Sequence, residues 1–112
     1  MAGPTGCTTP DRAEAVFLYQ NQVTAALAEA VQAAEAEGRD VVDELYDAEA
    51  ALRRECGPLQ NAGYRRINQE ELDTAQQFAA YDSVEACDAT AAEVEVLIRK
   101  VDPETASYFL SD

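Results

Sequence analysis

The stretch AYDSVEACDATAAEVEVLIRKV, residues 80–101, shows the clearest periodicity in this chain. Its apolar residues recur at alternating intervals of four and three without a miss: Ala80, Val84, Cys87, Ala91, Val94, Ile98 and Val101. This spacing places them along one face of an α-helix, as in the seam of a coiled coil. The stretch therefore predicts a long helix that buries this face against neighbouring helices.

The start of this helix is predicted further upstream. Asn68 with Glu71 matches a capping box, in which two side chains bond reciprocally to free backbone N–H groups. The expected helix therefore covers about 69–101. Asp82-Ser83 or Thr90 is the alternative start of a separate helix within this range.

A first helix is expected over 10–37. Thr9 followed by Pro10 is a favourable start, because a hydroxyl caps the helix and proline suits the first helical position. One face repeats at helical spacing: Ala13, Val16, Gln20, Val23, Leu27, Ala30 and Ala34. Gly38 is the expected end, and a helix that continues through Gly38 is the alternative.

A second helix is expected over 40–56, after an acidic cap pattern. Its apolar face consists of Val41, Leu45, Ala48 and Leu52. Gly57 and Pro58 favour a stop, because glycine accepts the left-handed closing conformation and proline lacks a backbone N–H. Residues 57–68 then form the connection to the third helix. In this connection Leu59, Ala62, Tyr64 and Ile67 allow a short turn of helix, and Gly63 allows a break in it.

Three amphipathic helices joined by short loops predict an all-α fold, a small antiparallel helical bundle of three long helices. Asp102 and Pro103 predict a short C-terminal helix that ends in the apolar cluster 108–110, which either caps the bundle or docks a partner. Residues 1–9 are expected to form a flexible N-terminal arm and 10–112 a single domain.

The three cysteines are Cys7, Cys56 and Cys87. Cys56 and Cys87 both fall on inward-facing stripes, so we expect them to meet, either as a disulfide or as two buried thiols. The redox compartment decides between these two states. Histidine and any Cys-x-x-Cys motif are absent, so no cysteine–histidine metal site is expected.

Charge divides the chain into three parts. The net charge is −14, of which residues 1–52 contribute −8, residues 53–66 +3 and residues 67–112 −9. Such acidity opposes direct binding to nucleic acid or to an anionic membrane surface, and no apolar run is long enough for membrane insertion. Contact with a basic protein is allowed, although a solubilising acidic surface explains the same composition.

The basic segment supplies the candidate partner-binding residues: Arg53, Arg54, Tyr64, Arg65 and Arg66. Arginine grips a carboxylate or phosphate with two parallel hydrogen bonds, and tyrosine adds an aromatic face of a kind common at interfaces. The alternative is that these arginines only neutralise neighbouring acids within the fold.

Residues for catalysis are scarce. Without histidine there is no Ser-His or Cys-His pair, and the commonest general base is missing. One predicted helix face carries Asp40, Asp43, Glu44 and Asp47, which allows Ca²⁺ or Mg²⁺ binding, although a solvated acidic face is the simpler interpretation. We expect no enzyme activity, no catalytic residue, no metal site and no cofactor.

The leading hypothesis is a non-catalytic helical interaction module, an accessory subunit or adapter that leaves an apolar strip exposed for a protein partner. One alternative is an acidic inhibitor that mimics nucleic acid in the basic groove of its target, and another is a carboxylate-based cation-binding protein. A homodimer is compatible with the alanine-rich core but is not required. A cytoplasmic location is expected, or a periplasmic or secreted one if a signal peptide has been removed.

Overall fold

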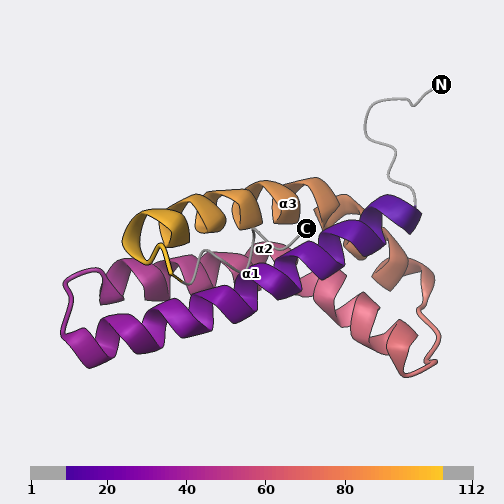
Figure 1. Ribbon diagram of the computed structural model, residues 1–112. Coiled ribbons are helices and arrows are strands. Elements are labelled where there is room, and N and C mark those ends of the chain that lie inside the picture. The colour runs from indigo at the N-terminus through magenta and orange to yellow at the C-terminus, as the bar shows by residue number, and fades with distance from the viewer. Residues whose placement is uncertain (1–9, 105–112) are drawn as a thin grey trace.

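The computed structural model describes residues 10–104, which contain three α-helices and no strand (Figure 1). The helices are α1 (Pro10–Glu37), α2 (Val42–Ile67) and α3 (Thr74–Val101). The all-α prediction is confirmed. The predicted arm over 1–9 and the apolar cluster 108–110 lie outside the described residues, so the short C-terminal helix stays a prediction.

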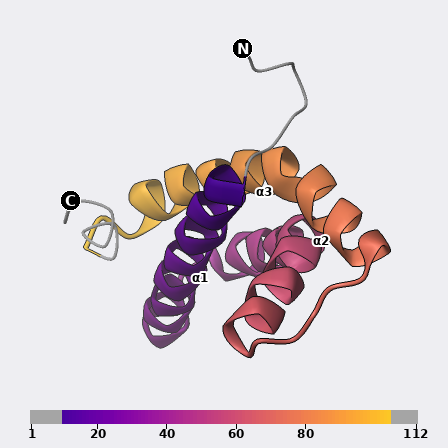
Figure 2. The ribbon, with the colours of Figure 1, turned by 90° about the vertical axis from the view of Figure 1, so that its right-hand side faces the viewer.

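The three helices contact one another pairwise, and successive helices run in opposite directions (Figures 1 and 2). In Figure 2, α3 lies across both α1 and α2. The seven seam residues predicted for α3 are all buried. They belong to one core cluster that also contains Val16, Val23 and Leu27 from α1 and Leu45 and Leu52 from α2. None of the described helices is long and apolar enough to cross a membrane.

α1 begins and ends at the predicted residues. Gly38 closes it with a φ of 64°, a left-handed conformation that glycine adopts at little cost, and the Arg39 N–H donates to the Ala34 carbonyl at 3.0 Å. The buried stripe includes one polar residue, Gln20, of which only 1 % is exposed. Its Nε2 donates to the Phe17 carbonyl at 3.2 Å, so the amide is buried with a partner.

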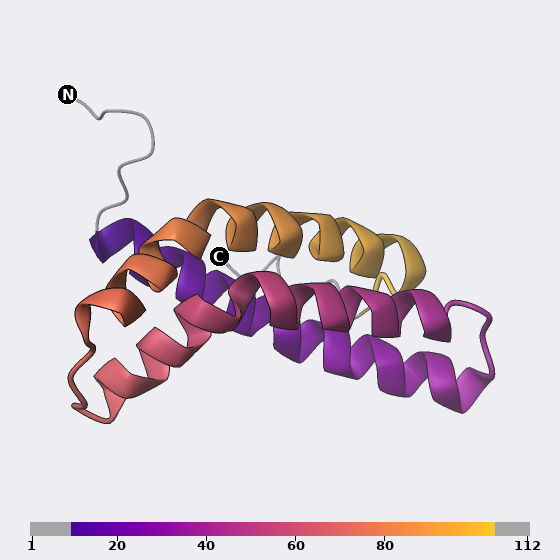
Figure 3. The same ribbon diagram turned by 180° about the vertical axis from the view of Figure 1, so that it is seen from behind.

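The predicted end of the second helix at Cys56 is wrong. α2 continues through Gly57 and Pro58 to Ile67, so most of the predicted connection 57–68 is helical. Proline removes one helix hydrogen bond and bends the helix, and α2 changes direction about halfway along (Figure 3). The helix persists because buried positions continue at helical spacing across the bend: Leu52, Cys56, Leu59 and Ala62.

α3 starts later than predicted. Its N-cap is Asp73, whose carboxylate accepts from the Gln76 N–H at 2.7 Å, while Gln76 Oε1 accepts from the Asp73 N–H at 3.0 Å. This capping box has the same form as the one predicted at Asn68 and Glu71, but it lies five residues later in the chain. Asn68 is instead the C-cap of α2: its N–H donates to the Tyr64 carbonyl at 3.0 Å and closes that helix.

Candidate functional site

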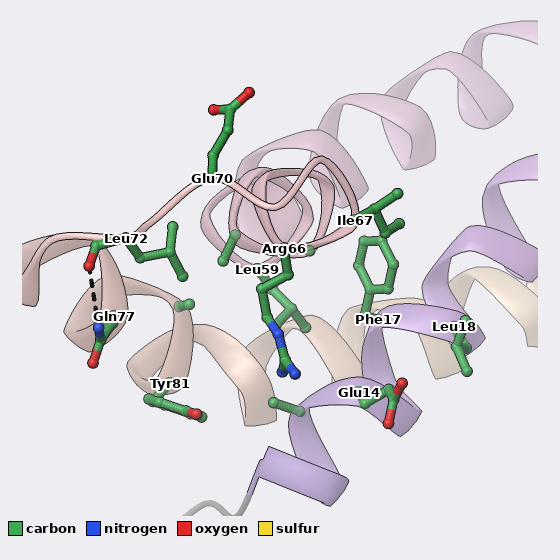
Figure 4. A pocket seen from close by; sticks show the side chains of 14 residues that line it. Glu14, Phe17, Leu18, Leu59, Arg66, Ile67, Glu70, Leu72, Gln77 and Tyr81 are labelled. Atoms are coloured by element: carbon green, nitrogen blue, oxygen red, sulfur yellow. Dashed lines mark hydrogen bonds between the residues drawn. The ribbon is translucent and has the colours of Figure 1, made fainter.

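A groove of about 680 Å³ lies between the first half of α1, the second half of α2 and the beginning of α3 (Figure 4). Figure 3 shows why it forms here: beyond its bend, α2 and the first turns of α3 incline away from α1. The apolar walls come from segments far apart in the sequence and include Phe17, Leu18, Leu59, Ile67, Leu72 and Tyr81.

The groove has a buried floor and an exposed apolar rim. Phe17 and Leu59 in the floor are only 7 % and 4 % exposed. The rim residues Leu18, Ile67 and Tyr81 expose 58 %, 66 % and 37 % of their surface. Apolar side chains gathered at one exposed place, rather than scattered singly, mark a surface suited to interaction.

Gly63 allows α1 and α2 to lie close together at the floor of the groove. A Cβ atom at this position would lie 2.3 Å from Cε1 of Phe17, so only glycine admits the phenyl ring where it lies. The same ring meets Tyr64 edge to face, with centroids 5.8 Å apart and planes at 87°. Such aromatic pairs contribute about 0.5–1.5 kcal/mol beyond the area they bury, which fixes this wall of the groove.

Arg66 is the cation of the groove. Its side chain extends from α2 across the groove towards α1 (Figure 4). It forms no ion pair with any residue between 10 and 104, whereas Arg65 beside it pairs with Glu70 at 3.6 Å. Glu14 and Glu70 also belong to the lining, and the Glu70 side chain points away from Arg66 (Figure 4). An exposed guanidinium between apolar walls can bind a carboxylate of another molecule by donating two hydrogen bonds to it.

The five residues predicted to bind a partner do not form one patch. Because α2 continues past Pro58, Arg54 and Arg65 are separated by about 16 Å of helix rise. Arg53 pairs with Glu49 at 3.8 Å, and Arg54 with its neighbour in the chain, Glu55, at 3.1 Å. Exposed pairs of this kind stabilise little.

The structure does bring Cys56 and Cys87 together, as a disulfide between α2 and α3. Their Cα atoms are 4.6 Å apart, and both residues are buried, with 1 % and 0 % exposed. The bond lies directly before Gly57 and Pro58, where α2 bends. It therefore anchors the two helices at the point from which the groove opens. Cys7 lies outside the described residues.

Polar contacts fasten α1 to α3 outside the groove lining. Arg12 Nη2 donates to Glu85 at 2.9 Å, and this hydrogen bond lowers the pKa of Glu85. Tyr19 donates its hydroxyl to Glu95, which also accepts from Arg99 Nε at 2.8 Å. Burial raises the pKa of Glu95, but the hydrogen bonds from Tyr19 and Arg99 and the charge of Arg99 outweigh it and hold this pKa below its ordinary value.

The predicted acidic face is solvent-exposed. It consists of Asp40, Asp43, Glu44 and Asp47, none of which forms an ion pair within residues 10–104. These carboxylates do not converge: no group of three or more histidine, cysteine or acidic side chains in the described part of the chain could hold a metal ion.

The groove itself was not predicted, although its sequence carries one signal. Leu18 and Tyr81 each follow a buried stripe residue, Phe17 and Ala80, and so lie just beside the core faces of α1 and α3. Large apolar residues beside a helical stripe can mark a second contact surface. What the sequence does not show is that the two helices place these residues around one groove.

The groove thus offers apolar contact area and charge, and its lining contains no histidine, cysteine, serine or lysine. Comparison with protein-family models, with curated proteins and with solved structures finds no significant match to this chain.

Proposed function

We propose that this chain is a small antiparallel helical bundle that acts as a non-catalytic protein-interaction module, with the groove as its contact surface. The observation that carries the proposal is the exposed apolar rim of Leu18, Ile67 and Tyr81 beside Arg66. Burying apolar surface contributes about 25 cal/mol per Å², while a charge within the contact selects among partners. Of the five predicted binding residues, Arg66 is the one that lines the groove.

A matched pair of substitutions tests this function. Ile67 and Val96 are both β-branched and both 66 % exposed, but only Ile67 lines the groove. The full chain, Ile67→Gln and Val96→Gln serve as bait in a native extract, and recovered proteins are quantified by mass spectrometry. We expect Ile67→Gln to lose partners that the wild type and Val96→Gln retain. Recovery of the same partners by all three, each shown by circular dichroism to be folded, would contradict the proposal.

One observation supports a second candidate, an acidic inhibitor of a basic protein. Asp40, Asp43, Glu44 and Asp47 are all exposed and without ion pairs among the described residues. A partner bound through such carboxylates should be released steeply as salt rises from about 50 to 200 mM. A partner bound through the groove should depend less on salt and more on Ile67.

A further inference from the structure

The groove's own chemistry indicates what kind of segment it binds. Its walls are apolar, but Arg66 projects between them, and Arg66 has no ion pair within the described residues. A purely apolar partner would bury this charge without an acceptor, which is unfavourable. A carboxylate would instead meet the guanidinium with two parallel hydrogen bonds. The segment that fits therefore carries an acidic residue within its apolar face.

The shape of the groove favours a helix. Its walls are side chains from three helices, and residues 10–104 contain no strand to which an extended peptide could add. Recognition by side-chain walls between helices is the mode in which an amphipathic helix lays its apolar face into a groove. At this end the helices diverge (Figure 3), so the bound helix would pack between α1 and the outer halves of α2 and α3.

Charge favours a different protein over a second copy of this chain as the partner. Each copy carries a net charge of −14, so self-association would bring like charges together. Glu14 and Glu70 also belong to the lining, although the Glu70 side chain points away from Arg66 (Figure 4) and pairs with Arg65. A segment with basic residues on its flanks complements Glu14, whereas the acidic surface of this chain does not.

We propose, on the basis of the function above, that the groove binds an amphipathic helix of another protein, which sets a carboxylate against Arg66 and turns basic residues towards Glu14. The binding energy comes from the apolar rim, and the carboxylate fixes the register of the bound helix. Arg66 is thus the residue that selects the partner.

The probe is a synthetic helical peptide of about 18 residues, with leucines on one face, one glutamate within that face and lysines along both flanks. A second peptide replaces the glutamate with glutamine. Fluorescence anisotropy measures both against the full chain, Arg66→Gln and Arg54→Gln. Arg54→Gln is the matched control, because it removes one exposed arginine from the same helix outside the groove lining.

We expect the wild type and Arg54→Gln to bind the glutamate peptide about tenfold more tightly than the glutamine peptide. Arg66→Gln should bind the two peptides equally. A preference that survives in Arg66→Gln, equal binding of both peptides by the wild type, or no binding of the glutamate peptide at millimolar concentration would overturn the inference. If native partners are still lost from Ile67→Gln, such a result overturns the carboxylate claim and leaves the proposed function standing.

Analytical ultracentrifugation of the isolated chain tests the choice of occupant. We expect a monomer for the wild type and for Ile67→Gln. A wild-type dimer that Ile67→Gln dissociates would place a second copy in the groove and overturn the inference.

Discussion

Gly63 shows how one residue shapes the groove, because the phenyl ring of Phe17 lies where a Cβ atom would be. We expect Gly63→Ala to lower the free energy of unfolding by about 1–3 kcal/mol, since the ring must move and the gain in helix propensity is smaller.

Gly57→Ala is the control, as its Cβ would meet nothing within 4 Å beyond its chain neighbours. There the gain in propensity is offset by crowding against Pro58, which leaves a change within about 0.5 kcal/mol. Urea unfolding measures both, and equal effects would contradict this account.

Glu95 makes stability depend on pH. Its pKa in the folded protein lies below the ordinary value, so the stabilisation it provides is present above the pKa of the unfolded chain and is lost as pH falls through the folded pKa. We expect Glu95→Gln to cost about 1 kcal/mol at pH 7 and less at pH 3. Glu93→Gln changes the net charge equally at an exposed position of α3. A cost of Glu95→Gln that stays constant from pH 7 to pH 3 would show that the Tyr19 and Arg99 contacts do not set this pKa.

At the scale of an element, the start of α3 depends on one of two similar capping patterns. Asp73 caps the helix through reciprocal bonds with Gln76, so Asp73→Ala should lower the free energy of unfolding by about 1 kcal/mol. Asn68→Ala should change it by no more than a few tenths, because the backbone N–H of Asn68, which alanine retains, makes the closing bond of α2. Thermal unfolding compares the two variants. A larger loss for Asn68→Ala would mean that the predicted start was correct in solution.

The helices themselves were largely predictable, and their boundaries less so. The seam from Ala80 to Val101 follows from apolar spacing, which directly reflects burial. The bounds of α1 follow instead from the Thr9-Pro10 start and from Gly38. The end of the second helix was mispredicted because Gly57 and Pro58 favour a stop locally, whereas Leu59 and Ala62 continue the buried stripe. Tertiary packing outweighs one lost hydrogen bond. Local signals alone do not reveal that balance.

At the scale of the molecule, the disulfide joins residues 31 positions apart and closes a loop that contains the second half of α2, the connection and the first half of α3. Constraining the unfolded chain in this way is worth about 3–4 kcal/mol. We expect the double variant Cys56→Ala, Cys87→Ala to lose that amount relative to the oxidised protein, and reductant to lower the melting temperature of the wild type but not of the variant. A wild-type melting temperature insensitive to reductant in the unfolding scan would contradict this.

The groove also belongs to the whole molecule, which explains why the sequence did not reveal it. The +3 segment suggested a patch of four arginines, but the continuous helix separates them, and only Arg66 and Arg65 are near the groove. Leu18 and Tyr81 come together with Ile67 only because the bend in α2 opens that end of the structure. Single positions could be predicted as exposed and apolar, but their convergence depends on how three helices pack.

We propose above that the groove is the contact surface for a protein partner. The most direct test is the dissociation constant of a recovered partner, measured by calorimetry with the wild type, Ile67→Gln and Val96→Gln. We expect Ile67→Gln to raise Kd by about tenfold or more, whereas Val96→Gln, equally exposed on α3, should leave it unchanged. Equal values of Kd for all three proteins, or a greater loss for Val96→Gln, would contradict the claim.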